Sequence, residues 1–452
     1  MATDQPQTPQ PPGETPWRAL PGAVPAMALL LAINMFNYID RQVLAAVEPQ
    51  VAQGLLLAES PDDPNVRAKM GLLSTGFLIS YMLIAPLFGM AAGRWPRWRL
   101  IALGVALWSL ASGASGLAGG FTLMLVTRCF VGVGEGAYGP IAPALISDLY
   151  PAAARGRVLS WFYLAIPVGG ALGYVLGGEA AAADPAHQSW RWGFYLAAIP
   201  GLLLALGSLA MREPRRGAAD HLDCPARRPR LGDYLLLLKT PSYVLDTLGM
   251  TAMTFSMGAL AWWMPDYLQL HAGKVFGLQP VSFFGIVTAV AGALATLSGG
   301  MAGDLLRKRF PGSYFLVSGL GLWLTVPCIL LFMSVPFNTA WIFVFLAVFF
   351  LFFNTGPSNA ILANVTHPSI RATGFALNIL VIHLLGDAIS PPIVGAMADY
   401  SRRMGVAPEK SLNAGFLTVS SLLLVGGAFW FWGARHLQRD TQAAARQVEV
   451  GS

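Results

Sequence analysis

The chain has 452 residues, of which 55% are hydrophobic and 12% are charged, and its mean hydropathy is +0.56. Soluble domains carry about 25% charged residues, so this composition excludes an ordinary soluble protein. The formal net charge is +6. Because the basic residues gather in particular loops between apolar blocks, they indicate membrane topology, and no nucleic-acid partner is expected.

The first 21 residues are polar and rich in proline. They lack the basic segment followed by a short apolar run that marks a cleavable signal peptide. We therefore expect residues 1–21 to form a disordered cytoplasmic tail, and the first apolar block after them to direct insertion into the membrane.

Apolar blocks of roughly 20 residues follow one another through the rest of the chain, and a helix needs about that length to cross a bilayer. The blocks are too long and too uniformly apolar for the strands of a membrane barrel. The sequence thus predicts an all-α polytopic membrane protein with twelve transmembrane helices. The predicted spans are 24–47, 70–92, 100–118, 121–147, 158–178, 192–211, 244–269, 280–302, 313–334, 339–362, 372–397 and 413–434.

The longest polar segment, 212–243, separates the sixth predicted span from the seventh and carries charges of both signs. It divides the chain into two six-helix bundles, 22–211 and 244–436, joined by a cytoplasmic linker that has room for a short surface helix. Residues 437–452 are expected as a second cytoplasmic tail. Lys and Arg are concentrated in the loops on the linker's side, so the positive-inside rule places both termini in the cytoplasm.

The two halves share weak internal similarity. GMAAGRWPR, which begins at Gly89, follows the second span, and GMAGDLLRK, which begins at Gly300, follows the eighth. Segments broken by Gly and Pro also correspond, at 132–143 in the fourth span and 354–360 in the tenth. Such a duplication with interrupted helices is typical of secondary transporters, whose substrate site lies near the membrane midplane between the halves.

The two repeated loops approach the pattern G-x-x-x-D-x-x-x-R/K, a turn between two helices. Its Gly permits close helix approach, and its Asp can cap a helix or pair with a basic residue of a neighbouring helix to form a gate. In the first copy Gly93 occupies the place of the Asp. An ordinary basic cytoplasmic turn is the alternative interpretation. The residues predicted at the gate are Gly89, Arg94, Arg97, Gly300, Asp304 and Lys308.

The first span contains NYIDR, 37–41, so that Asp40 and Arg41 lie inside an apolar run. A charge in a span costs roughly 2.5 kcal/mol or more unless it is paired, protonated or hydrated. Adjacent residues on a helix diverge by about 100°, so the two side chains cannot face one partner. Arg41 shares its face with a polar stripe that suits a cavity, formed by Asn34, Asn37 and Tyr38.

The fourth span supplies two further charges. Arg128 and Glu135 are seven residues apart, two helical turns, and so share a face. A purely structural ion pair is the alternative interpretation of these two residues. We hypothesise that a deprotonated Glu135 or Asp40 pairs with Arg41, and that protonation frees Arg41 and shifts the equilibrium between inward- and outward-facing states.

The eleventh span places His383 and Asp387 four residues apart on one face. Such a pair can relay protons or bind a polar headgroup, and a hydrogen-bonded pair that packs two helices is an equal alternative. No Ser or Cys stands in a nucleophile context such as G-x-S-x-G, and His and Cys show no metal-binding spacing. We expect no enzymatic activity, no metal and no cofactor.

Four stretches resemble spinster-type transporters of the major facilitator superfamily. They are NYIDR at 37–41, GVGEGAYGPIAPALISDLYP at 132–151, REPRRG at 212–217 and HLLGDAISPPIVGAMAD at 383–399. Transporters of this type move lysophospholipids and sphingosine phosphate-like lipids. Gly93 departs from the family pattern, which has an Asp at that place for the salt bridge of the first gate.

The resemblance implies the major facilitator fold and a secondary active transporter that moves amphipathic anionic lipids by alternating access, coupled to protons or gated by them. It implies that Asp40 and Glu135 are the protonatable pair and that Arg41 switches partners or attracts an anionic headgroup. The other candidate headgroup or switch residues are Arg128, Tyr38, Asn34 and Asn37. A bacterial homologue of this type is expected in the inner membrane, as a monomer whose partners are its lipid or other amphipathic anion, protons and the surrounding lipids.

Two other functions stay open. A small organic-anion symporter of the same superfamily is the first, but it should need more basic residues in the second half, and spans seven, eight, ten and eleven hold none. A passive lipid facilitator or a receptor-like membrane protein is the second, and stoichiometric, saturable, pH-driven uptake would exclude it.

Overall fold

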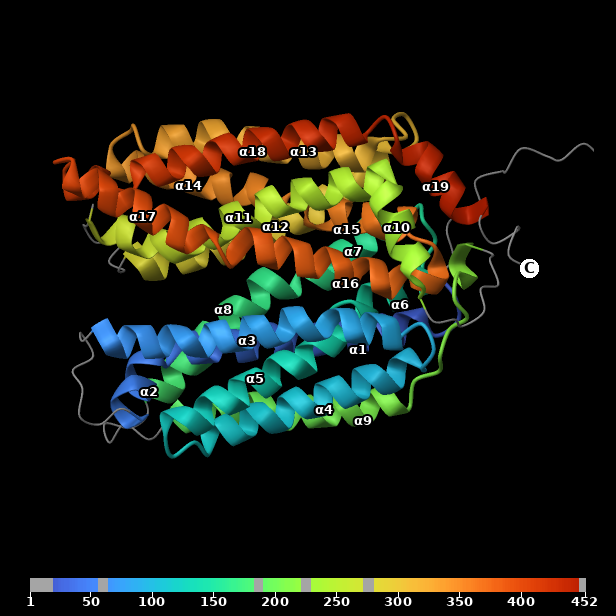
Figure 1. The fold of residues 1–452 in the computed structure, drawn as a ribbon, viewed down its shortest axis with the longest axis horizontal. Helices are drawn as coiled ribbons and strands as arrows, with labels where there is room; N and C mark the ends of the chain where they lie inside the picture. Colours follow the sequence, from blue (N-terminus) through green and yellow to red (C-terminus); the bar gives the residue numbers. More distant parts are fainter. Residues whose placement is uncertain (1–18, 56–63, 183–189, 221–228, 271–279, 447–452) are drawn as a thin grey trace, which may run out of the picture.

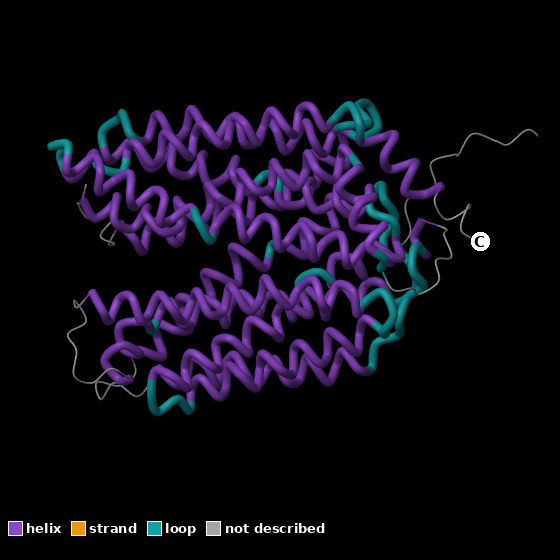
Figure 2. Tube along the Cα trace, viewed as in Figure 1, coloured by secondary structure: helices purple, strands orange, loops and turns teal. Residues whose placement is uncertain are grey.

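The computed structural model describes residues 19–55, 64–182, 190–220, 229–270 and 280–446. Within these ranges the regular secondary structure is helical and no strand occurs, as Figure 2 shows. The predicted N-terminal tail, 1–21, lies almost wholly outside the described residues, as do the last six residues of the predicted C-terminal tail. The all-α prediction is therefore confirmed for the part of the chain that the structure describes.

Figure 1 shows two bundles of helices lying side by side, one from each half of the chain. The first bundle comprises α1 (Ala23–Ala46), α3 (Pro64–Ala91), α4 (Arg97–Gly116), α5 (Phe121–Tyr138), α6 (Ile141–Leu149), α7 (Arg155–Tyr163), α8 (Ala165–Ala182) and α9 (Trp190–Leu209). The short helix α2 (Glu48–Leu55) follows α1 at one end of this bundle.

The second bundle comprises α11 (Pro241–Leu270), α12 (Pro280–Leu306), α13 (Ser313–Phe332), α14 (Phe337–Phe352), α15 (Thr355–Val365), α16 (Arg371–Ile382), η3 (His383–Asp387), α17 (Ser390–Arg403) and α18 (Asn413–Gly433). The single-turn helices η2 (Pro368–Ile370) and η4 (Pro408–Lys410) lie in its loops. The linker contains η1 (Ala218–Asp220) and α10 (Leu231–Lys239), and α19 (Leu437–Arg446) occupies part of the predicted C-terminal tail. In Figure 1, α10 and α19 lie at one end of the molecule and α2 at the other, and we call these the linker end and the opposite end.

Eleven helical segments among the described residues are long and apolar enough to cross a membrane. The predicted fifth span, 158–178, is not one of them, and the structure divides it between α7 and α8. Pro167 lies in the first turn of α8, and without an N–H it cannot bond the carbonyl group of Tyr163, so the helix breaks at Leu164. Together α7 and α8 occupy the place of the remaining span.

The fourth and tenth predicted spans are also interrupted, at places that correspond in the two halves. Gly139 and Pro140 separate α5 from α6, and Phe353 and Asn354 separate α14 from α15. These breaks fall in the two Gly- and Pro-containing segments that the sequence singles out. Interrupted helices at matching positions are a feature of transporters built from internal repeats.

Helix α8 packs closely against α1, the helix that carries NYIDR. A Cβ atom on Gly173 would lie 2.6 Å from the carbonyl oxygen of Ile39, and one on Gly169 would lie 2.9 Å from that of Met35. Glycine at both positions lets the two backbones come together. This contact fixes the rotation of α1 about its axis, and with it the directions of its charged side chains.

Candidate functional site

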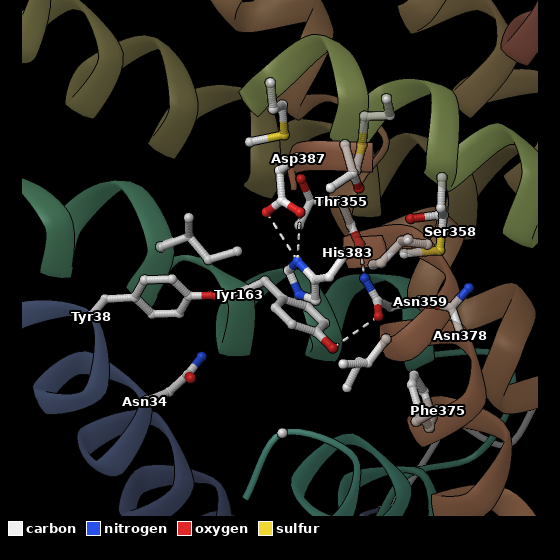
Figure 3. Close-up of a pocket in the computed structure, with 18 of the residues that line it drawn as sticks. Asn34, Tyr38, Tyr163, Thr355, Ser358, Asn359, Phe375, Asn378, His383 and Asp387 are labelled. Carbon is white, nitrogen blue, oxygen red and sulfur yellow. Dashed lines mark hydrogen bonds and ion pairs between the residues drawn. The ribbon is translucent and has the colours of Figure 1, made fainter. Parts of the chain in front are cut away.

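A cavity of about 350 Å³ lies between the two bundles (Figure 3). Helices α1, α3, α5, α7 and α8 line it from the first bundle, and α11, α14, α15, α16 and η3 line it from the second. Its walls are largely aromatic and aliphatic. Among the described residues that line it, Arg41 is the only Lys or Arg, and Glu135 and Asp387 are the only carboxylates.

Arg41 and Glu135 form an ion pair in the wall that the first bundle contributes. Nε and Nη2 of Arg41 each lie 2.6 Å from Oε2 of Glu135. The side chain of Arg41 is 23% exposed and that of Glu135 is 1% exposed, so the guanidinium faces the cavity and the carboxylate lies behind it. The centroids of three aromatic rings lie 5.1, 5.0 and 5.2 Å from the guanidinium carbon, those of Tyr38, Phe77 and Tyr81. Such contacts stabilise a cation that has lost part of its water.

Asp40 and Arg128 form a second ion pair, which does not line the cavity. Nη2 of Arg128 lies 3.7 Å from Oδ2 of Asp40, and the hydroxyl group of Ser112 donates a hydrogen bond to Oδ1. Arg128 also donates to the hydroxyl oxygen of Ser115 at 3.3 Å. Asp40 is 1% exposed and Arg128 is 2% exposed, so the pair is enclosed among α1, α4 and α5.

The two adjacent charges of NYIDR therefore have different partners, as their divergence around the helix requires. Arg41 turns to the cavity and Glu135, whereas Asp40 turns into the first bundle and Arg128. Arg128 and Glu135 share a face of α5, but seven residues separate them by roughly 10 Å along its axis. Each therefore meets a different residue of α1, and Arg128, a candidate headgroup or switch residue, lies outside the cavity.

The predicted polar stripe of α1 faces the cavity. Asn34, Asn37 and Tyr38 all line it, and Figure 3 shows Asn34 and Tyr38 on the α1 side. Nδ2 of Asn34 donates to the carbonyl oxygen of Phe162 at 2.9 Å. This bond ties α1 to α7, so the stripe is held in place by the first bundle itself.

The second bundle contributes His383 and Asp387, whose Nδ1 and Oδ2 atoms lie 2.9 Å apart (Figure 3). Both line the cavity, with side chains 17% and 28% exposed, so the pair lies in the cavity wall. They belong to η3, a π-helical turn in which Gly386 has φ −107° and ψ −105°. Pro391 and Pro392 follow at the start of α17, where a continuous helix would need their missing N–H groups. Such π turns often occur at functional sites.

Two side-chain contacts cross from one bundle to the other at the cavity, and the sequence analysis identified neither. The hydroxyl group of Tyr163 on α7 donates to Oδ1 of Asn359 on α15 at 2.8 Å (Figure 3). The ring of Tyr81 on α3 meets that of His383 edge to face, with 5.4 Å between centroids. Because Tyr81 also lies beside Arg41, its ring connects the ion pair of the first bundle with the His–Asp pair of the second.

The two glycines predicted at the gate lie where the bundles touch at the linker end. A Cβ atom on Gly89 of α3 would lie 2.6 Å from the Cβ atom of Ala376 on α16. A Cβ atom on Gly300 of α12 would collide with the hydroxyl group of Ser160 and lie 2.5 Å from the carbonyl oxygen of Gly156, both on α7. These approaches leave no room for a side chain, so tight helix contacts close this end.

Asp304 forms hydrogen bonds across one of these contacts. Its Oδ2 accepts from the backbone N–H of Arg157 at 3.0 Å and lies 3.8 Å from the Nε of that residue. The hydroxyl group of Tyr314 donates to Oδ1 at 2.7 Å. Lys308 and Arg94, also predicted at the gate, are exposed at this end.

Arg97, the last residue predicted at the gate, belongs to a larger charged network. We call it the linker clasp, and it consists of Arg97, Asp148, Arg155, Glu213, Asp220 and Arg371. Asp148 of α6 lies at its centre: Arg97 of α4 donates to Oδ2, and Arg371 of α16 donates to Oδ1 at 2.5 Å. All three are at most 2% exposed. One buried carboxylate thus joins the two bundles.

The linker supplies the other two carboxylates of the clasp. Oε1 of Glu213 accepts from Nε of Arg97 at 2.7 Å. Gly217 then turns the chain with φ +74°, a conformation that favours glycine, and its N–H donates to Oδ1 of Asp148 at 3.0 Å. This turn carries the chain on to Asp220.

Asp220 contacts both bundles. Its Oδ2 lies 2.5 Å from Nη2 of Arg155 on α7 and 3.2 Å from Nη2 of Arg371 on α16. Burial alone would raise the pKa of the Asp220 carboxyl, but the guanidinium groups of Arg155 and Arg371 lower the pKa below its ordinary value. The segment expected as a connector therefore contributes charged groups to the closure of the linker end.

The sequence analysis singled out neither Arg155 nor Arg371. One signal was available: Asp148 stands in an otherwise apolar stretch, ALISDLY, as Asp40 does in the first span. A carboxylate in such surroundings needs a partner, so the argument applied to Asp40 would have predicted a charged partner for Asp148 without identifying it.

Comparison with known proteins connects this site to a family. Residues 30–391 match a family model described as Major Facilitator Superfamily. The chain is 34% identical over 440 residues to Protein spinster homolog 1 of Xenopus laevis, an alignment that covers 92% of this chain and 81% of that protein.

Solved structures with similar folds include a bacterial homologue of the human lysosomal transporter Spinster in an inward-facing, unoccupied conformation. It has a TM-score of 0.64 and 22% sequence identity, and the match covers 94% of this chain and 99% of that chain. A double-tryptophan mutant of XylE has a TM-score of 0.76 and 15% identity, with 93% and 98% covered. At these identities the likeness establishes the fold.

Proposed function

Because the chain belongs to the major facilitator superfamily and, within it, to the spinster family, it is a membrane transporter and not an enzyme, and we propose that it moves amphipathic anionic lipids by alternating access. Lysophospholipids and sphingosine phosphate-like lipids are the proposed substrates. Protons drive or gate the movement through Glu135 and Asp40, and Arg41 attracts the anionic headgroup.

The observation that carries this proposal is the position of Arg41. Its guanidinium is partly exposed in a cavity that holds no other Lys or Arg among its described lining residues. Apolar side chains such as Met250, Met253 and Phe375 line the second bundle's side of the same cavity. A single cation beside apolar walls suits a ligand with one anionic group and a hydrocarbon portion.

An anionic headgroup would compete with the carboxylate of Glu135 for Arg41, and a proton on Glu135 would remove that competition. The carboxylate holds both Nε and Nη2 of Arg41, the same donors that a phosphate group would bind. Protonation of Glu135 would weaken this ion pair and release the donors. Substrate binding and protonation therefore favour each other at this site, which is the coupling that a proton-dependent transporter requires.

The closed linker end supports a cycle of alternating access. The clasp and the glycine contacts close that end, and the cavity lies beyond them. The inward-facing spinster homologue has the higher sequence identity of the two solved structures, yet its TM-score of 0.64 is lower than the 0.76 of the XylE mutant. A different position of the bundles would account for this, and we propose that transport requires the clasp to open.

The test is uptake by proteoliposomes that contain the purified protein. Labelled lysophospholipid, sphingosine phosphate and a small organic anion are compared, with and without a pH gradient. We expect saturable uptake of a lipid, faster with the gradient and lowered about tenfold or more by Arg41→Gln, because a charge-assisted contact is lost. The matched control is Arg99→Gln, an exposed arginine outside the predicted gate that should leave uptake unchanged. Uptake that changes neither with the pH gradient nor with Arg41→Gln would contradict the proposal.

The proton role has its own test in the same assay. Asp40→Asn and Glu135→Gln each remove one protonatable group with little change of shape. At least one variant should lose the pH dependence of uptake. Wild-type pH dependence in both variants would exclude these two carboxylates as the proton sites.

The small organic-anion symporter gains one supporting observation. His383 lines the cavity from the second bundle, so its protonated form would supply the second basic group that such a symporter needs. The assay distinguishes the two functions, because the symporter should take up the organic anion in preference to either lipid. Saturable, gradient-driven uptake of any of the three would exclude a passive facilitator.

A further inference from the structure

Helix α10 of the linker exposes a row of leucines at the linker end. Leu231, Leu235 and Leu238 are 77%, 50% and 58% exposed. They stand at positions i, i+4 and i+7 and therefore lie on one face of the helix. The opposite side is attached to the protein, since Leu237 is 2% exposed and belongs to the apolar core.

The helix α19 offers a matched comparison, because it has similar length and lies at the same end. It buries Leu437 and Ala444 and exposes polar residues such as Gln438 and Gln442, as a helix facing water should. The two helices thus differ in their outer faces, which are apolar in α10 and polar in α19. Water cannot be the favourable environment of the outer face of α10.

We propose that α10 lies in the interface of the leaflet at the linker end, with its leucines among the acyl chains and its basic residues against acidic headgroups. Continuity supports this placement: Thr240 alone separates α10 from α11, which begins at Pro241 and belongs to a membrane span. The leucine row extends the lipid-facing surface of the spans onto the linker. An amphipathic helix of this kind binds a membrane in the plane of its surface.

The preference for an acidic leaflet follows from charge. Arg230 and Lys239 stand at the two ends of α10, and both are exposed. Basic residues beside an interfacial helix attract anionic lipids. Asp233 does not offset this attraction from the outer face, because it is buried and its Oδ2 accepts from the backbone N–H of Arg230 at 2.6 Å.

This surface has a consequence for the linker. One part of the linker, at Asp220, is held by the clasp, and the other, at α10, is held by the leaflet. The linker is therefore fixed to the membrane while the bundles move, and the composition of the leaflet acts on the segment that supplies the clasp carboxylates. The inference rests on the exposed leucines and basic residues of α10 and on the adjoining membrane span, and it stands whatever the protein transports.

The experiment places an environment-sensitive NBD fluorophore at Leu235→Cys, and separately at Leu231→Cys, in full-length protein whose three native cysteines are replaced by serine. The protein is reconstituted into phosphatidylcholine vesicles with and without phosphatidylglycerol, and lipids brominated on the acyl chain serve as quenchers. The matched control is the same label at Gln438→Cys on α19.

We expect both α10 labels to emit at shorter wavelength than the α19 label and to be quenched at least twice as strongly by brominated lipid, as for a face buried roughly 5–10 Å into the interface. Removing phosphatidylglycerol should weaken that quenching, as should Lys239→Gln in its presence. Quenching of α10 no stronger than that of α19 would overturn the proposal. A short-wavelength emission without lipid quenching would also overturn it and assign the face to another protein segment. Quenching independent of phosphatidylglycerol would overturn the preference for acidic lipid.

Discussion

The linker clasp contains the same kinds of side chain as two ion pairs of the first bundle, Arg41–Glu135 and Asp40–Arg128, which we call the central ion pairs. The two regions differ in how completely these side chains are hydrogen-bonded. In the clasp, both oxygens of Asp148 and both oxygens of Glu213 accept hydrogen bonds. At the centre, Oδ2 of Asp40, Oε1 of Glu135 and Nε of Arg128 have no hydrogen-bond partner among the described residues. A fully bonded network holds a structure together, whereas partly bonded groups remain ready to accept a proton or an anion.

The clasp and the central ion pairs also differ in which parts of the chain supply their side chains. The clasp takes its residues from the first bundle, the linker and the second bundle, so it breaks when the bundles separate. The two central pairs lie wholly within the first bundle, so they can persist through such a movement. We therefore expect substitutions in the clasp to change the balance of conformations, and substitutions at the centre to change the response to protons and substrate.

The largest effect on stability is expected from Arg371→Gln. It leaves Asp148 and Asp220 each with one arginine fewer in a buried setting, and breaking a buried ion pair costs about 3–5 kcal/mol. The free energy of unfolding should fall by that amount, and spin labels across the linker end should report a larger distance between the bundles. Arg371→Lys, which keeps the charge but not the forked geometry, should lie between the variant and the wild type. An unchanged distance distribution would show that the clasp does not hold this end closed.

The next largest effect is expected from Asp40→Asn, compared with Glu135→Gln. Asp40→Asn leaves the buried Arg128 without a countercharge, so we expect a loss of about 2–3 kcal/mol in unfolding free energy. Glu135→Gln should cost about 1 kcal/mol, because Arg41 is partly exposed and keeps its three aromatic contacts. Thermal and denaturant unfolding in the same detergent measure both values. A larger loss of unfolding free energy in Glu135→Gln than in Asp40→Asn would contradict this assignment, in which the Asp40 pair stabilises the fold and the Glu135 pair serves the cavity.

A smaller, pH-dependent effect is expected from Asp220. The folded-state pKa of its carboxyl is lowered by Arg155 and Arg371 despite its burial, so Asp220 stabilises the fold above its unfolded pKa of about 4. That contribution is lost as the pH falls through the lowered folded-state pKa. Asp220→Asn should reduce stability by roughly 1–2 kcal/mol at neutral pH and narrow its difference from the wild type in acid. A difference that grows as the pH falls would contradict this assignment.

The smallest effect is expected from Arg94→Gln. Arg94 and Arg97 stand three residues apart in the same loop motif, but only Arg97 is buried in the clasp. We expect Arg94→Gln to change the unfolding free energy by less than about 0.5 kcal/mol, and Arg97→Gln to destabilise the protein as Arg371→Gln does. Equal losses in the two variants would show that the motif acts as a general basic surface.

Much of the fold could be predicted, because hydropathy marks the spans and Gly and Pro mark their interruptions. The fifth span was less visible as a break, since one proline inside an apolar run does not by itself fix where a helix ends. The divergence of Asp40 and Arg41 followed from helical periodicity alone. Their partners did not, because periodicity gives the face of a helix but not the height at which two helices meet.

The clasp could not be predicted in this way. Asp148, Asp220 and Arg371 are brought together by the packing of α6, the linker and α16, and residues so far apart in the chain share no periodic pattern. Arg155 stands in a basic segment that membrane topology already explains, so nothing in the sequence indicated its role in the clasp. A carboxylate in an apolar stretch indicates a buried charged partner, but the stretch itself does not identify that partner.

The composition of the clasp also has a consequence for how the protein is made. The first bundle and the linker emerge from the ribosome before the second bundle is made. Most of the clasp can therefore assemble early, namely Arg97, Arg155, Asp148, Glu213 and Asp220. That nascent half holds three carboxylates against two guanidinium groups. Arg371, synthesised last, supplies the missing positive charge. The unfilled place would attract the second bundle into register during biogenesis.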